Sequence, residues 1–362
     1  MKKFIGFERG MGIGGWLTNY KRFNVLPDEW RMKLTIGDFE HFETYITERD
    51  VEYIASLGMD HIRLGFDQIV VEQNPYEYRE NILKIMDRFV CQCKKHGLNI
   101  VLNLHKAIGN YCDIQEDVEL LDDEALQKRF IALWLMLEKR YADSPGIAFE
   151  LLNEVRNVDP QKWNNLAERT INEIRKINKS RKIIIGGTCW NSVGALKDLK
   201  VYDDENVIYT FHMYEPHSFT HQRGVLMAAP LYYNRKMPYP GDIERYKDYE
   251  KTVNNNPDAY SKYSKMDKQF IYDMMQPGLD FIKSNPDKIL WCGEFGTIRH
   301  CDIVWRENWM RDVISFLIEN NIPYCVWNYL STPNDGNRFS LVDDDSRLIL
   351  SENMGKIIRG DI

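Results

Sequence analysis

A short apolar run that ends in a polar residue and is followed by an amphipathic helix recurs along most of the sequence. Apolar runs of this kind are typical of strands that are buried on both faces of a parallel sheet. Eight strand-helix alternations can be counted. This is the number that closes a barrel, so we predict an α/β fold of the (β/α)8 or TIM barrel type.

The predicted strands and helices alternate with few interruptions. The strands cover residues 11–16, 60–66, 98–104, 147–152, 182–187, 207–211, 289–293 and 323–327. Apolar residues at three- and four-residue intervals predict helices over 51–57, 82–97, 130–141, 160–177, 305–319 and 352–358, with a short one near Leu196. The glycine-rich first strand lacks the spacing of a nucleotide-binding loop, and we expect Trp16 to emerge near the barrel mouth.

The alternation breaks between residues 219 and 275, after the sixth strand. This segment is rich in Tyr, Pro, Asn, Lys and Asp, and Tyr239-Pro-Gly241 and Asn254-Asn-Asn-Pro257 are turn signals. A loop of this length without secondary structure is rare in a compact domain. We therefore predict one barrel domain over 1–362, with a mainly helical subdomain over 219–275 that is inserted on the mouth side and flanks the cleft.

Charge and composition exclude several classes of partner. There are 47 Lys and Arg against 54 Asp and Glu, a formal net charge of −7, whereas nucleic-acid binding depends on clustered cations. We therefore expect no nucleic-acid partner. No run of 18 apolar residues occurs, so no membrane span is predicted. Many of the 9 Trp, 20 Tyr and 16 Phe would pack in the core, and the others would line a cleft for flat ligands such as sugar rings.

The cysteines and the N-terminus give weaker information. Seven cysteines form no regular framework, and several lie inside apolar runs, so we expect mostly reduced, structural thiols. The N-terminus has a basic start but no apolar stretch of the length that a signal peptide needs. We expect a monomer.

Two of the apolar runs end in a glutamate. Glu154 follows the run Ile147-Ala-Phe-Glu-Leu-Leu-Asn153, and Glu294 follows Lys288-Ile-Leu-Trp-Cys-Gly293. Because the parallel strands of a barrel point their carboxyl ends at one mouth, we expect the two carboxylates to face each other. Such a pair hydrolyses glycosidic bonds, since one group protonates the leaving oxygen and the other attacks the anomeric carbon. The alternative is that each glutamate forms a salt bridge with an Arg or Lys that lines the barrel.

Polar residues at other strand ends suggest a supporting set for this pair. Arg63 would keep the Glu294 carboxylate ionised, since a nearby opposite charge favours the charged form, and Tyr214 would donate to the same carboxylate. Apolar walls and the neighbouring anion would keep Glu154 protonated near neutral pH. Asn153 is placed to hold the sugar 2-hydroxyl, with a capping amide as the alternative.

Two histidines and a tryptophan complete the predicted set. His105 and His212 would contact substrate hydroxyls or orient the acid, unless they are structural, and Trp327 would offer a flat face to a sugar ring, unless it packs in the core. A metal site is the competing interpretation of these strand ends. Barrel metallohydrolases use His-x-His on a strand, but this chain has His105-Lys106-Ala107 there and no HExxH. We therefore expect no metal and no cofactor.

These motifs together resemble glycoside hydrolase family 5 of the cellulase superfamily. The matching segments are Ile62-Arg63-Leu64, Leu104-His105, Phe149-Glu-Leu-Leu-Asn-Glu154, Phe211-His-Met-Tyr214, Cys292-Gly-Glu-Phe-Gly296 and Val326-Trp-Asn-Tyr329. The resemblance runs along essentially the whole chain. Gly14-Gly-Trp16, Phe219-Thr-His-Gln222 and the insertion after the sixth strand resemble most the bacterial endoglucanase C or lichenase type, which acts on cellulose derivatives and mixed-linkage β-glucan.

The resemblance implies roles for individual residues. Glu154 would be the acid/base and Glu294 the nucleophile, supported by Arg63, His105, Asn153, His212, Tyr214 and Trp327. Lys106 departs from the pattern, since a histidine is expected there, and this changes the sugar contacts at that position. Trp190 and the loop Gly109-Asn-Tyr-Cys112 are also expected to border the binding cleft.

The resulting hypothesis is a retaining endo-acting β-glucanase that cleaves β-1,4 linkages in cellulose-type and mixed-linkage glucans. A polymeric substrate favours a secreted or cell-associated protein, although a cytoplasmic location stays open because no signal peptide is visible. The alternatives are a β-mannanase or an exo-acting β-glucosidase on the same scaffold, because specificity resides in loops. From another class, the chain would be a catalytically silent carbohydrate-binding barrel.

Overall fold

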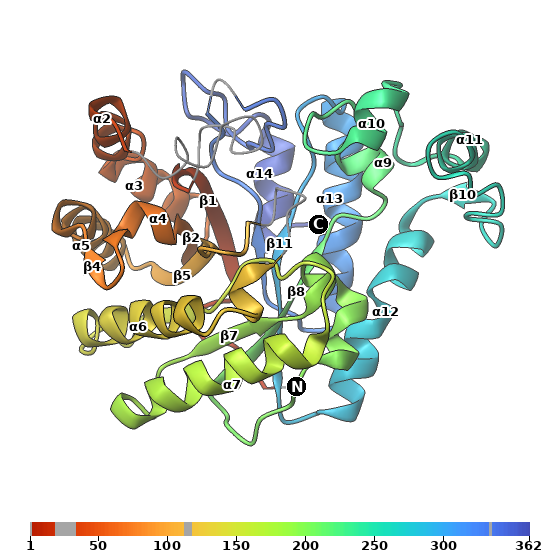
Figure 1. Ribbon diagram of the computed structural model, residues 1–362. Coiled ribbons are helices and arrows are strands. Elements are labelled where there is room, and N and C mark those ends of the chain that lie inside the picture. Colours follow the sequence, from red (N-terminus) through yellow and green to blue (C-terminus); the bar gives the residue numbers. More distant parts are fainter. Residues whose placement is uncertain (1, 19–33, 112–117, 333–334) are drawn as a thin grey trace.

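The computed structural model of the protein describes residues 2–18, 34–111, 118–332 and 335–362 (Figure 1). Eight parallel strands form a closed barrel in the order β1-β12-β11-β8-β7-β6-β5-β2, which confirms the predicted TIM barrel. The strands are β1 (Arg9–Leu17), β2 (His61–Asp67), β5 (Asn99–Lys106), β6 (Ile147–Glu150), β7 (Ile183–Gly186), β8 (Val207–Met213), β11 (Ile289–Phe295) and β12 (Tyr324–Val326). The first and last strands of the barrel, β1 and β12, pair directly and close the ring.

Helices surround the strands, and the long ones α5, α6, α7, α12 and α13 form the outer layer (Figure 1). The α-helices are α2 (Ile36–Thr44), α3 (Glu48–Ser56), α4 (Gln68–Val71), α5 (Glu80–Lys95), α6 (Glu124–Arg140), α7 (Pro160–Ile177), α8 (Thr188–Asn191), α9 (His217–Thr220), α10 (Ala228–Tyr233), α11 (Ile243–Asn254), α12 (Lys268–Ser284), α13 (Ile303–Glu319) and α14 (Glu352–Arg359). The described elements also include two 3-10 helices, η2 (Glu119–Leu121) and η3 (Val193–Asp198). Two small two-stranded sheets complete them: β3 (Glu72–Asn74) with β4 (Glu77–Tyr78), and β9 (Gly241–Asp242) with β10 (Lys265–Met266).

Local sequence explains where these helices begin. Helix α3 starts before the predicted residue 51, because Thr47 is its N-cap and forms a capping box with Asp50. The short helix predicted near Leu196 is the 3-10 helix η3. None of the helices in the described part of the chain combines the length and the apolar character that crossing a bilayer requires.

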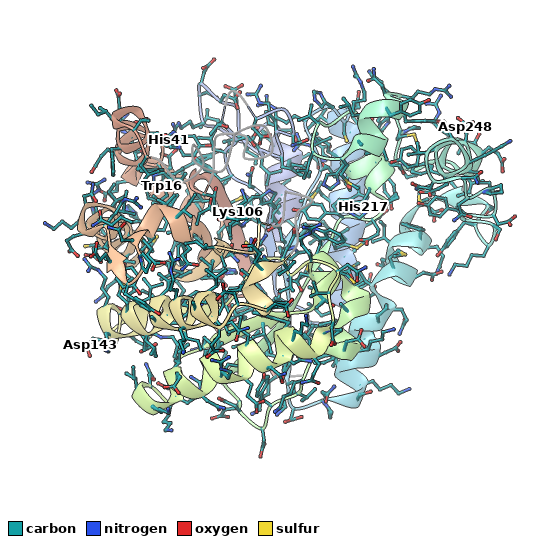
Figure 2. All side chains as sticks on the ribbon, viewed as in Figure 1. Trp16, His41, Lys106, Asp143, His217 and Asp248 are labelled. Carbon is teal, nitrogen blue, oxygen red and sulfur yellow. The ribbon has the colours of Figure 1, made fainter. Side chains whose placement is uncertain are left out.

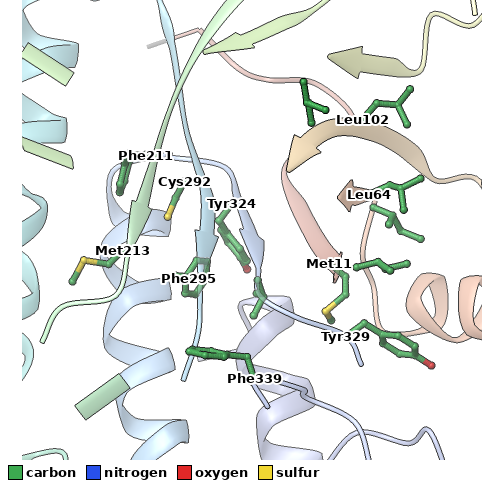
Figure 3. Packing of buried hydrophobic residues seen from close by; sticks show 14 of the residues in the cluster. Met11, Leu64, Leu102, Phe211, Met213, Cys292, Phe295, Tyr324, Tyr329 and Phe339 are labelled. Carbon is green, nitrogen blue, oxygen red and sulfur yellow. The ribbon is translucent and has the colours of Figure 1, made fainter. Parts of the chain in front are cut away.

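Side chains alternate along each barrel strand between an outer and an inner packing region. On β8, Tyr209 and Phe211 pack in the outer region, between the strands and the helices, and Ile208 packs in the barrel interior. Figure 3 shows part of this outer packing region, in which Phe211 lies beside Cys292, its partner in the register of β8 and β11. His212 follows the alternation of Ile208, so the same rule that fills the interior turns His212 toward the barrel axis.

Trp16 contradicts the prediction that it emerges at the mouth. Its side chain is 2% exposed, and its Nε1–H donates to the carbonyl oxygen of Phe42 at 2.8 Å. The ring packs edge to face on Phe89, with the centroids 5.2 Å apart. An indole whose N–H has a backbone acceptor is stable inside the protein, and α2 supplies that acceptor for Trp16.

Between β8 and β11 the chain forms α9, α10, β9, α11 and β10 before it enters α12, and β9 pairs with β10 on either side of α11. The predicted end of the insertion, residue 275, falls inside α12. Helices α10 and α11 lie to one side of the barrel, at the right of the view (Figure 1). The backbone N–H groups of Val225 and Leu226 donate to Oδ1 of Asn337, at 2.8 and 2.9 Å. These bonds tie the segment to the loop that follows β12.

The cysteines within the described residues are free thiols, in agreement with the expectation of mostly reduced side chains. They are Cys91, Cys93, Cys189, Cys292, Cys301 and Cys325. Cys112, which belongs to one of the loops predicted to border the cleft, lies outside the described residues.

Candidate active site

The carboxyl ends of the barrel strands bring the predicted site residues to one mouth. Each comes from an inward-facing position on a strand or from the residues directly after it. Arg63 lies on β2, His105 on β5, His212 on β8 and Glu294 on β11, while Asn153 and Glu154 follow β6, Tyr214 follows β8 and Trp327 follows β12.

Glu154 and Glu294 lie close together on either side of His212. One carboxylate oxygen of each glutamate and a ring nitrogen of His212 all lie within 4.8 Å of one another. Nδ1 of His212 is 2.8 Å from Oε1 of Glu154, and its Nε2 is 4.0 Å from Oε2 of Glu294. The Glu154 side chain is 18% exposed and that of Glu294 only 6%. The two carboxyl groups therefore share one site but differ in their access to solvent.

The Glu294 carboxylate is held by two donors. Nη1 of Arg63 donates to its Oε2 at 2.7 Å, and the hydroxyl of Tyr214 donates to its Oε1 at 2.6 Å. Burial raises the pKa of Tyr214 well above its usual range, and the Glu294 charge raises it further, so the phenol stays a donor. Burial alone would lower the pKa of Arg63, but the carboxylates of Glu150 and Glu294 raise it above the ordinary value.

Burial also sets the charge of the histidines. It lowers the pKa of His212 to about 4, against the pull of Glu294 in the opposite direction, so the ring is neutral near pH 7. Burial lowers the pKa of His105 well below its usual value, and Lys106 and Arg63 lower it further. Both rings therefore act as neutral hydrogen-bonding groups and not as cations.

Comparison with known proteins places this site in a family. The family model described as Cellulase (glycosyl hydrolase family 5) matches residues 29–332. Endoglucanase C of Acetivibrio thermocellus is 38% identical over 336 residues, which cover 90% of this chain and 92% of that protein. The chain belongs to glycosyl hydrolase family 5. It is thus a glycoside hydrolase, as its resemblance at the strand ends implies.

Two further proteins are similar to most of the chain. Cellodextrinase A of Ruminococcus flavefaciens is 29% identical over 316 residues, covering 86% of this chain and 81% of that protein. The solved structure of Thermotoga maritima Cel5A in complex with cellobiose superposes with a TM-score of 0.74 at 25% identity, covering 97% of both chains. The same T. maritima enzyme has also been solved in complex with mannotriose.

The other predicted family 5 site residues lie around this pair. Oδ1 of Asn153 accepts a hydrogen bond from Nη2 of Arg63. The ring of His105 stacks on that of Trp327, at a centroid distance of 5.3 Å and an interplanar angle of 8°, and Nδ1 of His105 is 3.0 Å from Oδ1 of Asn103. Trp327 is half-buried, and one face of its ring packs on His105.

Lys106, which is predicted to border the cleft, is 6% exposed, about as much as Glu294 at 5%. It ends β5 and lies in the central part of the molecule, whereas Asp248 of α11 lies at the outer edge (Figure 2). Its place beside the cleft stays a prediction.

Trp190 is 44% exposed and stands on an unusual turn after β7. Cys189, Trp190 and Asn191 all have left-handed backbone angles, with φ values of 54°, 55° and 56°. The backbone N–H of Trp190 donates to the carbonyl oxygen of Val155 at 2.8 Å, and Oδ1 of Asn191 accepts from the N–H of Gly187 at 3.1 Å. These bonds fix an exposed indole beside the segment that carries Glu154.

Two residues of the site were missed or only partly anticipated. Glu150 is fully buried on β6, and both of its oxygens accept hydrogen bonds from Arg63. The available signal was a charged residue within a buried apolar run, four positions before Glu154. Asn110, in the loop predicted to border the cleft, is instead buried and donates to the backbone oxygen of Glu154 at 3.1 Å.

Glu154, His212 and Glu294 are also the one group in the described residues that has the spacing of metal ligands. Arg63 already donates to Glu294, so a cation bound there would face the guanidinium charge at close range. The donor set of one imidazole and two carboxylates suits acid-base chemistry equally well, and a chelator experiment separates the two uses.

Proposed function

We propose that the protein is a retaining, endo-acting β-glucanase that hydrolyses β-1,4 linkages in cellulose-type and mixed-linkage β-1,3-1,4-glucans. The observation that carries the proposal is the spacing of Glu154 and Glu294, whose nearest oxygens are within 4.8 Å. Retaining glycosidases keep their two carboxyl groups about 5–5.5 Å apart, whereas inverting enzymes leave about 6.5–9.5 Å for a water molecule. The observed spacing supports direct attack by one carboxylate.

In the first step, a carboxylate oxygen of Glu294 forms a bond to the anomeric carbon as the glycosidic C–O bond breaks. Glu154 transfers its proton to the leaving oxygen. In the second step, water attacks the same carbon, Glu154 takes the proton of that water, and the ester bond breaks to restore the Glu294 carboxylate. The neutral His212 orients Glu154 through the contact of 2.8 Å, and Asn153 binds the sugar 2-hydroxyl through its amide group.

The assignment of Glu294 as nucleophile follows from its donors. Arg63 and Tyr214 both donate to its carboxylate, which favours the ionised form and fixes its orientation. The Glu154 side chain is 18% exposed against 6% for Glu294, and this greater exposure gives the leaving group and water access to it. The difference between the two environments separates the roles of nucleophile and acid/base.

The cleft would be extended by aromatic rings and by the insertion. Trp190 and Trp327 provide faces for sugar rings, and residues 219–275 form a subdomain that flanks the cleft through their bonds to the loop after β12. The names of the relatives support a glucan substrate, since one is an endoglucanase and a cellobiose complex is known for T. maritima Cel5A. A polymeric glucan also implies that the enzyme acts outside the cell or at its surface. We propose that it acts as a monomer.

A β-mannanase is the second candidate, because T. maritima Cel5A has been solved with mannotriose as well. Reducing-sugar release from mixed-linkage β-glucan, carboxymethylcellulose, laminarin and mannan would rank the substrates, with Glu294→Gln as the control. We expect fastest release from mixed-linkage glucan and a ladder of oligosaccharides. Mannan as the best substrate would replace the glucanase proposal, monosaccharide as the only product would indicate exo action, and binding without release would indicate a silent barrel.

The stereochemistry has its own test. Proton NMR of the first product detects the anomer before mutarotation, and we expect the β anomer from a β-linked substrate. The α anomer would show inversion and would remove the covalent intermediate from the proposal.

A further inference from the structure

Glu150 is a buried carboxylate for which the proposed mechanism has no role. It lies on β6 with no exposed surface, and its residue faces the barrel interior. Nε and Nη2 of Arg63 donate to its two oxygens, at 2.7 and 2.9 Å. This two-point geometry is the strongest form of a guanidinium-carboxylate pair, and it leaves Nη1 of Arg63 free to face Glu294.

The charges of this group do not balance one to one. Arg63 carries one positive charge and is paired with two carboxylates, Glu150 and Glu294. One paired carboxylate compensates a buried arginine, and a second carboxylate beside it adds repulsion between the two anions. The surplus carboxylate therefore points to a step in which one of the two anions is lost.

Such a step exists if the proposed function holds, and the inference rests on it. When Glu294 bonds to the anomeric carbon it becomes a neutral ester, and Glu154, which gives its proton to the departing oxygen, becomes the carboxylate. Without Glu150, the fully buried guanidinium of Arg63 would then have no carboxylate among its described hydrogen-bond acceptors. An ion pair of this kind that loses one partner leaves an uncompensated charge inside the protein.

We propose that Glu150 is a positioning residue, the permanent counter-ion of Arg63 that keeps the guanidinium paired while Glu294 is esterified. Because Arg63 stays paired with Glu150, the covalent intermediate does not contain an isolated buried charge. The bidentate contact also holds Nη1 at the place where the Glu294 carboxylate returns. The titratable groups that surround Arg63 and Glu150 are His105, Glu154, His212, Tyr214, Glu294 and Cys325.

The test measures the two steps separately with an activated 2-deoxy-2-fluoro-β-cellobioside, which traps the glycosyl-enzyme. Mass spectrometry gives the rate of labelling and, after removal of excess reagent, the rate of release. In Glu150→Gln the isosteric amide removes the charge, so the intermediate becomes less stable relative to the free enzyme. We expect labelling about tenfold slower and release about tenfold faster than in the wild type. A merely structural defect would slow both steps.

Two further variants make the outcome decisive. Glu150→Asp keeps the anion, so the ratio of the two rates should stay near the wild-type ratio even if a shorter side chain slows both. Glu138→Gln removes a carboxylate that is equally buried against Arg181, outside the mouth, and should leave both rates unchanged.

The inference is overturned if Glu150→Gln changes neither rate or slows both together. A ratio of the two rates in Glu150→Asp that differs from the wild-type ratio by about tenfold or more would also overturn it, and this comparison with the wild type holds even if Glu150→Gln does not fold. Failure of the proposed function looks different, because the wild type itself would then not be labelled, or would be labelled at a residue other than Glu294.

Discussion

The molecule contains two buried arginine-glutamate pairs that are chemically alike and differ in what else the arginine contacts. Arg181 donates to both oxygens of Glu138, at 2.7 and 3.2 Å, and its other donors go to the carbonyl oxygens of Tyr141, Ser144 and Ile147. Arg63 donates in the same way to Glu150 but directs its remaining donors to Asn153 and Glu294.

The difference separates a structural pair from a working one. Backbone carbonyls saturate Arg181 with acceptors that never change charge, so this group locks α6 to the start of β7. The guanidinium of Arg63 instead donates to the side chains of Glu150, Asn153 and Glu294, and the last of these is the proposed nucleophile. A buried ion pair alone is therefore weak evidence for function, whereas a second carboxylate on the same arginine is strong evidence.

Removing the carboxylates should show the largest contrast between the pairs. Glu294→Gln is expected to reduce kcat about a thousandfold or more, since it deletes the nucleophile while the fold is retained. Glu138→Gln should leave kcat within a factor of about two, because its arginine is remote from the reacting atoms. Initial rates on mixed-linkage glucan, with circular dichroism for folding, provide the measurement. Near-native turnover of Glu294→Gln would remove the mechanism.

Replacing the arginines themselves should sharpen the contrast. Arg63→Lys keeps the charge but cannot bridge two carboxylates, and we expect kcat to fall about a hundredfold. Arg181→Lys breaks the fork with Glu138 and should lower the free energy of unfolding by about 3 kcal/mol with little change in kcat. Denaturant unfolding and initial rates on both variants test this pairing of effects. A similar loss of activity in both would show that the two pairs do not differ in kind.

Acid should destabilise the protein through His212, a buried histidine of the mouth. The pKa of His212 is lowered by burial to about 4, against about 6.5 in an unfolded chain. Between these values the unfolded state binds more protons, so this residue makes the free energy of unfolding fall as the pH drops from about 6.5 to about 4. The loss is at most about 3 kcal/mol. Urea unfolding at several pH values in this window gives the free energy of unfolding as a function of pH. We expect that free energy to depend less steeply on pH in His212→Asn than in the wild type, and an equal dependence would contradict the assignment.

A substitution in the predicted cleft wall should change KM and leave kcat unchanged. Trp190 is the exposed ring of the left-handed turn after β7, and Trp190→Ala removes a stacking face worth about 1 kcal/mol, or about fivefold in KM. Oligosaccharide kinetics measure it, with Trp16→Phe as a control indole that is buried away from substrate. A fall in kcat alone would instead indicate that the turn positions Glu154.

The smallest expected effect is that of a chelator. Dialysis against EDTA should leave activity unchanged, because Arg63 already supplies the positive charge that neighbours Glu294. Loss of activity that Zn2+ or Ca2+ restores would assign the group of Glu154, His212 and Glu294 to a metal.

The barrel and its mouth were predictable because strand periodicity and strand ends are local features. A buried run followed by Asn153 and Glu154 identifies both a strand and the residues lifted beyond it. The prediction for Trp16 was wrong because burial of that ring depends on a carbonyl from α2, which no pattern around Trp16 reveals.

Glu150 escaped prediction for a related reason. Its charge could be recognised in the sequence, but its partner Arg63 is 87 positions away, and the run that contains Glu150 has the pattern of a plain strand. The left-handed turn at Trp190 likewise depends on the side chain of Asn191, whose acceptor role is set by the end of β7. Both cases require contacts between elements, which the order of residues does not give.

The pairing of β1 with β12 is also required for assembly of the active site. Arg63 on β2 and Glu294 on β11 are 231 positions apart, and the strands between them in the ring are β1 and β12, the first and last strands of the barrel. Their ion pair therefore spans the seam of the barrel, and an unclosed ring leaves the two groups apart. Contacts of such sequence separation form late and slowly. Catalysis by this ion pair thus requires a closed barrel, and a chain that has not yet formed β12 lacks the assembled site.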